Sequence, residues 1–476
     1  MTYQDIKDLK PKIVGKARRE SFGGLYYERR RLIVEMMNDI AYHIISLCNG
    51  ENTVENVKQS IMREYRVSED ILENDLAEYV HYLLNSGFIT MDGIETAKAN
   101  NIVLKPMLEE NEIKQNRYSL GTPPFTLSAP MKVLLELTHN CNLKCVHCMA
   151  DATCKITSKG YLDGELDTNA WYQIIDQIFE AEVFEILLSG GEPTLRNDFI
   201  DIAKYIHSKG ATYCLLSNTT LIDMQLAKQL KETGCNKVES NLDGYNDDTY
   251  DDFRGVKGSF KKTVEGIKAC LANDIPVRCN VMETKKTVIY LKEIVDFAYS
   301  IGVREVCVVP LEQGGRAKGN MELAFNKSDI EKLTDFYIEV NDWFEKKYGN
   351  SGMVLLTPYT LQKRSGSRYS KIFDLNNFIP SCGAGKIHCT IDPYGDVKLC
   401  PSDANVLKRE RLNLLEKSLK DIWESSETLM KARGTLRSEC VTCQNFECTN
   451  RCPVQRLDPD LPEDLKTRNC LMDGAL

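Results

Sequence analysis

The chain has 476 residues, a formal net charge of -9 and 18 cysteines. At about 150 residues per domain, this length predicts about three domains, and the acidic balance argues against a nucleic-acid partner, which needs a basic surface. The cysteines are too many for a routine cytosolic protein and too sparse for a small disulfide-rich scaffold, which favours metal or redox chemistry.

Residues 1–95 are expected to form a small winged-helix-like α+β module. Short β-prone runs are found at Ile13–Gly15, Gly24–Tyr27 and Leu32–Met36. Three helices follow, with N-cap side chains at Asn38, Thr53 and Ser68. We expect the core face of the third helix to consist of apolar residues at helical spacing: Ile71, Leu72, Leu76, Tyr79, Val80 and Leu83. The segment Met1–Lys7 has no signal-peptide core, and no stretch approaches the ~18 apolar residues of a membrane span, so we expect a cytoplasmic protein without a membrane partner.

This order of strands and helices, closed by Gly87–Ile89, resembles the leader-recognition element of enzymes that modify ribosomally made peptides. The resemblance implies that the leader of a precursor peptide adds as a strand beside the third strand and against the third helix. Between Lys10 and Arg31 there are eight basic and two acidic residues. Such a run is usually a solvated face, and the alternative is a docking surface for an acidic leader. Residues 96–130 lack periodicity, and we expect them to form a linker.

The motif Cys141-x3-Cys145-x2-Cys148 directly follows the apolar run Val133–Thr138. Three thiolates on one short loop can bind three irons of a cubane cluster and leave the fourth iron open to a small ligand. A zinc loop is the alternative, but zinc prefers Cys-x2-Cys pairs that close a tetrahedron. The motif resembles the radical S-adenosylmethionine (radical SAM) superfamily. In that superfamily the open iron of the 4Fe–4S cluster chelates the amino and carboxylate groups of S-adenosylmethionine.

Strand-like and helix-like segments alternate from Val133 to about Leu323. The expected strands are Val133–Thr138, Phe184–Leu188, Thr212–Leu216, Lys237–Leu242, Val277–Val281 and Glu305–Val309. The expected helices are Asp167–Glu180, Phe199–Ser208, Leu221–Glu232, Phe260–Asn273 and Val288–Ile301. This alternation predicts an α/β fold with a parallel sheet and helices outside it. At ~31 residues per unit, residues 131–325 hold about six units, a partial (β/α)6 TIM-like barrel as in radical SAM enzymes.

Ser189–Pro193 follows the second strand, at the edge where parallel barrels carry their chemistry. Gly190 and Gly191 lack Cβ atoms, so the backbone can approach a ligand closely, and Glu192 can accept hydrogen bonds from an ammonium group. With Pro193, this segment matches the GGEP loop of the superfamily. The resemblance implies further cofactor contacts at His147, Ser217, Asn218, Ser240, Asn241 and Arg316. His147 occupies a position that is usually aromatic and lies near the adenine.

After a helical bridge over residues 326–378, cysteines return in residues 379–476, a pattern that resembles the SPASM extension with two auxiliary 4Fe–4S clusters. The resemblance implies that Cys382, Cys400 and Cys452 bind the first auxiliary cluster. It assigns the second to Cys440, Cys443, Cys448 and Cys470, for which zinc is an alternative. Cys389 lies on an expected strand and is either a small core residue or the fourth ligand of the first auxiliary cluster. We expect the seven remaining cysteines to be core thiols: Cys48, Cys154, Cys214, Cys235, Cys270, Cys279 and Cys307.

Nearly the whole chain resembles radical SAM peptide maturases, and the thioether-forming sactipeptide and ranthipeptide synthases most. That closer resemblance is carried by Leu242–Gly244, Phe253–Gly258 and Cys382–Gly385. It implies an electron donor of the flavodoxin or ferredoxin type, a 5′-deoxyadenosyl radical, and a bond from a cysteine sulfur to a carbon of the precursor peptide. The alternatives are carbon–carbon cross-linking or residue oxidation of a peptide or protein, and a non-catalytic iron–sulfur protein that binds peptides.

Overall fold

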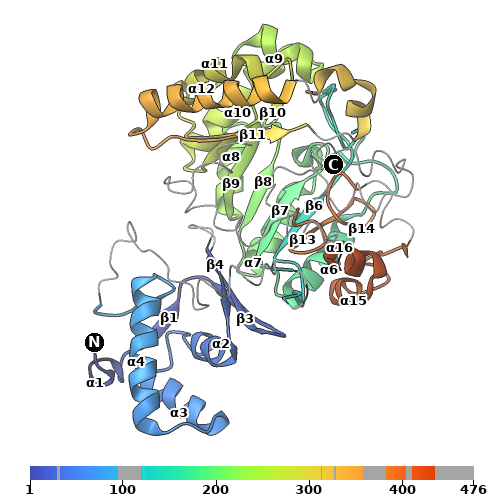
Figure 1. The fold of residues 1–476 in the computed structure, drawn as a ribbon. Helices are drawn as coiled ribbons and strands as arrows, with labels where there is room; N and C mark the ends of the chain where they lie inside the picture. The colour runs from blue at the N-terminus through green and yellow to red at the C-terminus, as the bar shows by residue number, and fades with distance from the viewer. Residues whose placement is uncertain are drawn as a thin grey trace, which may run out of the picture. The chain divides into compact units, whose positions relative to one another are not determined.

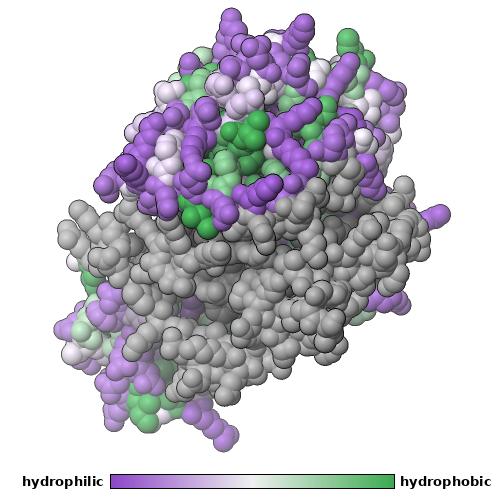
Figure 2. Space-filling view, turned by 45° about the horizontal axis from the view of Figure 1, so that its top comes forward, coloured by the Kyte–Doolittle hydropathy of each residue, from purple (hydrophilic) through white to green (hydrophobic). Residues whose placement is uncertain are grey.

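The computed structural model describes residues 1–28, 33–94, 120–121, 123, 125–311, 314–325, 329–357, 382–403 and 410–434. The described residues up to Ser128 form one compact unit, and those from Ala129 onward form another. No helix in these described ranges is long and apolar enough to cross a membrane. The described surface seen in Figure 2 is mainly hydrophilic, with hydrophobic residues in small patches.

The first unit combines two small antiparallel sheets with helices (Figure 1). Its elements are α1 (Tyr3–Ile6), β1 (Pro11–Ile13), β2 (Lys16–Glu20), β3 (Gly23–Glu28), β4 (Ile33–Met37), α2 (Asp39–Ser46), α3 (Val54–Glu64), α4 (Glu69–Asn85) and β5 (Ile89–Met91). One sheet has the order β2-β3-β4, and the other pairs β1 with β5. The side chains of Asn38 and Thr53 accept hydrogen bonds from the first turns of α2 and α3, so these two helices begin where their caps predict.

The third expected cap, Ser68, precedes α4 but makes no side-chain hydrogen bond to its first turn. Two further details of this unit differ from the sequence-based expectation. Ile71 was expected in the core face of α4, but it is 59% exposed, whereas Leu72, Leu76 and Val80 are buried. Ile71 lies in the first turn of the helix, where residues can face solvent although their spacing fits the core face.

The second difference concerns the basic segment. Lys16–Glu20 forms strand β2, and its Arg18 is 1% exposed and paired with Glu20 at 2.7 Å. Glu20 also accepts a hydrogen bond from the backbone N–H of Ser128 at 2.7 Å. The basic segment is therefore not a uniform solvated face. Arg29, Arg30 and Arg31 lie outside the described residues.

The second unit is built on one nine-stranded sheet with the order β12-β11-β10-β9-β8-β7-β6-β13-β14. The strands are β6 (Lys132–Glu136), β7 (Glu185–Ser189), β8 (Tyr213–Leu216), β9 (Cys235–Asn241), β10 (Val277–Glu283), β11 (Glu305–Pro310), β12 (Val354–Leu356), β13 (His388–Ile391) and β14 (Val397–Lys398). The six strands β6 to β11 pair in parallel and in chain order, as predicted for a partial barrel. The expected strand around Cys389 is β13, which pairs in parallel with β6, and β12 extends the opposite edge.

Helices cover the outer face of this sheet, and Figure 1 shows α10, α11 and α12 beside β10 and β11. The helices are α6 (Thr168–Glu180), α7 (Phe199–Ser208), α8 (Met224–Glu232), α9 (Asp247–Arg254), α10 (Ser259–Ala272), α11 (Leu291–Ser300), α12 (Ile330–Tyr348), α15 (Leu419–Ser425) and α16 (Glu427–Gly434). The main hydrophobic core lies between these helices and the sheet. Helix α9 was not expected from the sequence.

The opposite, concave face of β9, β10 and β11 is charged. Val238 and Val306 belong to the main core, and because side chains alternate along a strand, their neighbours point to the concave face. These neighbours are linked ion pairs: Lys237 with Glu305 at 2.7 Å, Arg278 with Glu239 at 3.1 Å, and Arg278 with Glu305. A closed eight-stranded barrel fills this space with apolar side chains, whereas here the concave face is polar and partly exposed.

Candidate functional site

The cysteines Cys141, Cys145 and Cys148 share the loop that follows β6, which we call the cluster loop (residues 137–153). Cys141 and Cys145 are each 9% exposed, Cys148 is partly buried, and all three are free thiols. The start of the loop is fixed by Glu165, whose carboxylate accepts hydrogen bonds from Thr138 Oγ1 and His139 N at 2.7 Å each. The three thiols are therefore presented by a constrained backbone at the carboxyl end of β6.

Each of the three sulfurs accepts a hydrogen bond from an N–H group. Cys141 Sγ accepts from the backbone N of Leu143 at 3.4 Å and from Asn218 Nδ2 at 3.9 Å. Cys145 Sγ accepts from Arg254 Nη1 at 3.5 Å. Cys148 Sγ accepts from the backbone N of Ala152 at 3.5 Å. Because hydrogen bonds to sulfur tune iron–sulfur clusters, this donor set fits a cluster held by three thiolates.

Burial and the neighbouring carboxylate of Glu192 raise the pKa of the Cys141 thiol to about 12. A thiol with this pKa keeps its proton until a metal displaces it, so metal binding here releases protons. No group of three His, Cys, Asp or Glu side chains within the described ranges is arranged around a single metal ion. A cubane cluster does not require such an arrangement, because each thiolate binds a different iron.

Two cysteines elsewhere in the chain donate their hydrogen bonds instead of accepting them. Cys48 Sγ donates to Ile44 O at 3.3 Å, and Cys235 Sγ donates to Lys237 O at 3.4 Å. Cys214, Cys270 and Cys279 are buried as expected for core thiols. Two expectations fail: Cys154 is exposed, and Cys307 is only partly buried because its position on β11 alternates with the core residues Val306 and Val308.

The loop after β7 packs directly on the cluster loop. Gly191 N donates to Thr138 O at 2.6 Å, and Glu192 N donates to Asn140 O at 2.8 Å. A Cβ atom on Gly190, whose φ is +144°, would lie 2.4 Å from Thr138 O, and one on Gly191 would lie 2.2 Å from Asn140 O. The two glycines are therefore needed for the approach of one loop to the other. Pro193 is buried and begins a short 3-10 helix.

Glu192 joins the loops that follow β7 and β8. It is fully buried, and its Oε1 accepts hydrogen bonds from Thr194 Oγ1 at 2.5 Å and from Ser217 Oγ at 2.8 Å. Further hydrogen bonds come from the backbone N of Thr194 at 3.1 Å and of Asn218 at 2.8 Å. Burial raises the pKa of Glu192. A carboxylate offers about four acceptor sites, so an ammonium donor would have to share or replace one of these contacts.

Strand β9 places Ser240 and Asn241 on opposite sides of the sheet. Ser240 is fully buried, and its Oγ lies 3.0 Å from Thr219 Oγ1. In the paired strand β10 it lies beside Cys279, a core residue. Ser240 therefore points toward the helices, and the partly buried Asn241 lies on the concave face, where a cofactor would bind.

Arg316 holds the cluster loop from the segment after β11. Its Nε donates to Cys145 O at 2.9 Å, and its Nη1 donates to Ala152 O at 2.8 Å. Its backbone N donates to Cys148 O at 2.9 Å. Gly315 adopts φ +47°, and a Cβ atom there would lie 2.5 Å from Cys148 O. These contacts make Arg316 a brace for the loop backbone.

His147 stacks on the ring of Phe253, with centroids 4.4 Å apart and ring planes 15° from parallel. It is 7% exposed, and its Nδ1 has no hydrogen-bond partner in the described part of the chain. Burial, together with Arg254 and Arg316, lowers the pKa of His147 well below its usual range. The imidazole is therefore neutral.

Three residues of the site were not assigned from the sequence: Glu165, Asp243 and Arg254. Glu165 lies 26 to 27 residues beyond the groups it binds, and nothing in its local sequence indicates this contact. Asp243 and Arg254 lie in Leu242–Gly244 and Phe253–Gly258, segments that carry the family resemblance without indicating a role. They form a buried ion pair with each other.

The described C-terminal cysteines do not share one environment. Cys382 is exposed and Cys400 is partly buried. Cys389 is fully buried in the main core and lies beside Val133 of β6, a position that agrees with the core alternative. Cys440, Cys443, Cys448, Cys452 and Cys470 lie outside the described residues.

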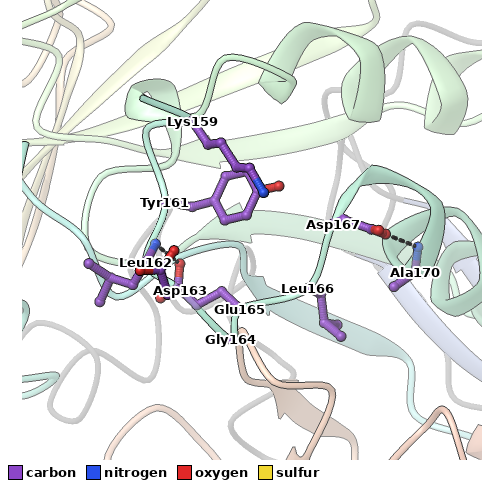
Figure 3. Close-up of a pocket in the computed structure, with 9 residues that line it drawn as sticks. All are labelled: Lys159, Tyr161, Leu162, Asp163, Gly164, Glu165, Leu166, Asp167 and Ala170. Atoms are coloured by element: carbon purple, nitrogen blue, oxygen red, sulfur yellow. Dashed lines mark hydrogen bonds between the residues drawn. The ribbon is translucent and has the colours of Figure 1, made fainter. Parts of the chain in front are cut away.

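A cavity of about 360 Å³ lies beside residues 159–167, the segment that contains Glu165 (Figure 3). Its lining includes Lys159, Tyr161 and Asp163, and Asp167 caps α6 at its side. The carboxylate of Glu165 also accepts a hydrogen bond from Leu162 N at 2.8 Å. None of the three cysteines of the cluster loop lines this cavity.

Family models match three segments of the chain. Residues 135–298 match the Radical SAM superfamily, residues 25–89 match coenzyme PQQ synthesis protein D (PqqD), and residues 382–453 match the SPASM iron–sulfur cluster-binding domain. The first kind of domain binds a 4Fe–4S cluster and S-adenosylmethionine, and the SPASM domain binds auxiliary iron–sulfur clusters.

Relatives and solved structures agree with this organisation. The chain is 27% identical to an AdoMet-dependent heme synthase of Methanosarcina barkeri, over 67% of this chain and 89% of the relative. It is 28% identical to the mycofactocin maturase MftC of Mycobacterium tuberculosis, over 72% of this chain and 84% of the relative. SuiB of Streptococcus suis, solved with its precursor peptide SuiA, has a similar fold with a TM-score of 0.67 at 17% identity, covering 95% of this chain and 98% of SuiB.

Proposed function

We propose that this chain, which belongs to the radical SAM superfamily and also carries a PqqD-type and a SPASM domain, is a maturase of a ribosomally made precursor peptide. The proposal rests on one observation: two features occur together in this chain. One is a loop with three cysteines whose sulfurs all accept N–H hydrogen bonds. The other is a PqqD-like module with a sheet edge suited to a peptide. The similarity to a mycofactocin maturase and to SuiB with its precursor peptide supports a peptide substrate.

Cys141, Cys145 and Cys148 would hold a 4Fe–4S cluster with one open iron. When bound, the cluster and S-adenosylmethionine supply the radical chemistry that activates a carbon–hydrogen bond. The chain's own residues fix the geometry: Glu165 and Arg316 brace the cluster loop, and Glu192 ties the loops after β7 and β8 to each other. We propose Gly190, Gly191, Glu192, Ser217, Asn218 and Asn241 as the cofactor-facing set, and His147 as a packing residue.

The leader of the precursor would pair with β4. Among the described residues this strand is hydrogen-bonded only to β3, so its other edge carries backbone donors and acceptors for an added strand. Glu35 of β4 lies near Tyr79 and Tyr82 of α4, so this helix lies across the same strand. Backbone hydrogen bonds would supply affinity, and the side chains of β4 and α4 would supply selectivity.

The core peptide would enter the concave face of the sheet. The ion pairs of Lys237, Glu239, Arg278 and Glu305 keep this face polar and partly exposed. A polar, open face leaves room for a peptide backbone, which carries its own polar groups. It lies on the same side of the sheet as Asn241.

We propose a thioether as the product, because Leu242–Gly244, Phe253–Gly258 and Cys382–Gly385 resemble the thioether-forming synthases. A cysteine S–H and a C–H of the peptide are broken and a C–S bond forms. One hydrogen atom leaves to the deoxyadenosyl group, and one proton and one electron leave separately. We propose that Cys382, Cys400 and Cys452 would hold the first auxiliary cluster of the SPASM domain and Cys440, Cys443, Cys448 and Cys470 the second, and that these clusters, when bound, would supply an acceptor for the electron. A flavodoxin- or ferredoxin-type protein would deliver the initiating electron.

The test uses the reconstituted full chain, S-adenosylmethionine, a reductant and a cysteine-containing precursor peptide. We expect a product two hydrogens lighter that no longer reacts with iodoacetamide, because thioether formation consumes the thiol. Tandem mass spectrometry would then locate the bridge. A product two hydrogens lighter with every thiol still reactive would favour the alternative, carbon–carbon cross-linking or residue oxidation. An unchanged peptide without deoxyadenosine formation would refute the maturase proposal.

A further inference from the structure

The end of α9 packs against the middle of the cluster loop. The backbone N of Lys144 donates to Arg254 O at 3.0 Å, and that of Val146 donates to Phe253 O at 3.2 Å. Gly255 ends the helix with φ +71°, and a Cβ atom there would lie 2.6 Å from Lys144 O. The segment Phe253–Gly255 therefore needs its glycine for close approach, and it places the Arg254 side chain beside Cys145.

Arg254 lies between a sulfur and a carboxylate. It is 4% exposed; its Nη1 donates to Cys145 Sγ at 3.5 Å, and its Nη2 pairs with Asp243. Asp243 is fully buried and accepts a hydrogen bond from the backbone N of Met282 at 2.6 Å. The guanidinium is therefore fixed from β10 through Asp243, and it contacts the sulfur directly.

One donor of this guanidinium is not used by the protein. The buried Nε of Arg254 has no hydrogen-bond partner in the described ranges. An unpaired buried donor costs free energy, and arginine keeps its charge in every protein environment. A sulfide of a bound cluster beside Cys145 is an acceptor that would satisfy this N–H group.

We propose that Arg254 is a positioning residue that sets the reduction potential of the cluster bound by Cys141, Cys145 and Cys148. A charge-assisted N–H···S bond draws electron density from the Cys145 thiolate and favours the reduced cluster, which carries one more negative charge. The buried location strengthens the interaction, because little water screens it. The inference rests on the proposed function only in that the cluster is bound, and it holds for any peptide reaction.

The experiment is a redox titration of the anaerobically reconstituted full chain, followed by electron paramagnetic resonance. The signal to follow is the one that changes when S-adenosylmethionine is added, since only a cluster with an open iron can respond in this way. The variants are Arg254→Gln, which removes the charge, and Arg254→Lys, which keeps it. Lys144→Gln is the matched control, because Lys144 is an exposed cation one residue from Cys145.

For Arg254→Gln we expect the ratio of reduced to oxidised cluster at a fixed potential to fall about tenfold, which is about 59 mV for one electron. The ratio for Arg254→Lys should lie between those of Arg254→Gln and wild type, and the ratio for Lys144→Gln should equal that of wild type. If Arg254→Gln does not retain iron, Asp243→Asn/Arg254→Gln, which leaves no unpaired buried carboxylate, should show the same fall. A shift no larger than that of Lys144→Gln would overturn the inference. Wild type without an S-adenosylmethionine response would instead refute the proposed function.

Discussion

Cys141 and Cys145 of the cluster loop are buried, as are Cys48 and Cys235, yet the hydrogen bonds of these two pairs run in opposite directions. Cys141, Cys145 and Cys148 accept from N–H groups. Cys48 and Cys235 donate to backbone carbonyls. Burial raises the pKa of both the Cys141 and the Cys279 thiol to about 12, at Cys141 together with the carboxylate of Glu192. The direction of the hydrogen bonds therefore distinguishes the three cysteines of the cluster loop from Cys48 and Cys235.

The largest expected difference is between replacing a cysteine of the cluster loop and replacing a cysteine of the core. Cys145→Ala should lose about four irons per chain and all S-adenosylmethionine cleavage, since two thiolates and an open loop do not hold the cluster. Cys279→Ala should keep its iron and activity and lose about 1 kcal/mol of stability through a small cavity. Iron analysis with a deoxyadenosine assay checks both variants. Iron loss in Cys279→Ala would break the distinction between the classes.

The next largest effect concerns Glu192, whose carboxylate joins the loops after β7 and β8. Glu192→Gln replaces one acceptor oxygen by an NH2 group that faces the donors of Ser217, Thr194 and Asn218. Supporting groups of a metal site typically contribute ~10–100-fold to affinity or activity. We expect S-adenosylmethionine affinity, measured by equilibrium dialysis, to fall in that range. The control is Glu185→Gln, which breaks the pair with Lys132 at the opposite end of β7 and should leave the affinity unchanged.

A smaller effect is expected from substitutions of Gly315 and Gly319, two glycines in the segment after β11. Gly315→Ala forces a Cβ atom to 2.5 Å from Cys148 O at φ +47°, whereas Gly319→Ala meets nothing within 4 Å. The first variant should destabilise the cluster-loop contact by about 1–3 kcal/mol. The measurement is the rate of iron loss to a chelator. Equal rates for the two variants would show that the segment after β11 does not brace the loop.

The sequence predicted the six barrel strands to within a few residues, because their apolar runs lie between clear turns. It missed α9, whose segment Asp247–Arg254 has only two buried apolar side chains, Tyr250 and Phe253. It missed β2 because Lys16–Glu20 looks like a solvated charge run, although Arg18 and Glu20 neutralise each other in the interior.

For the site, the sequence located the cysteines and the glycine loop, since local spacing carries that chemistry. It did not locate the residues that hold the cluster loop in place. Arg254 lies 109 residues from the sulfur it contacts, and Arg316 lies 171 residues from the carbonyl it binds. Only the folded sheet brings these loops together. The same limit applies to Ser240, whose direction depends on strand register.

The smallest effect concerns Glu35, a partly buried acid in the first unit. Burial raises the pKa of Glu35 from 4.5 to about 7. Between these values the folded state keeps a proton that the unfolded state loses, so the stability of this unit should fall as pH rises through that window. The fall should be roughly 1–2 kcal/mol after solvent screening, since Glu35 is partly exposed. Hydrogen exchange of β4 amides at pH 6 and pH 8 checks this, and Glu35→Gln should abolish the difference. A stability that rises with pH would contradict the assignment.

The most direct test of the central claim is deoxyadenosine formation by the anaerobically reconstituted chain with S-adenosylmethionine and a reductant. We predict formation by wild type and by Cys279→Ala, and none by the triple variant Cys141→Ala/Cys145→Ala/Cys148→Ala. If wild type holds its iron but forms no deoxyadenosine, or if the triple variant still forms it, the account of the cluster loop is wrong.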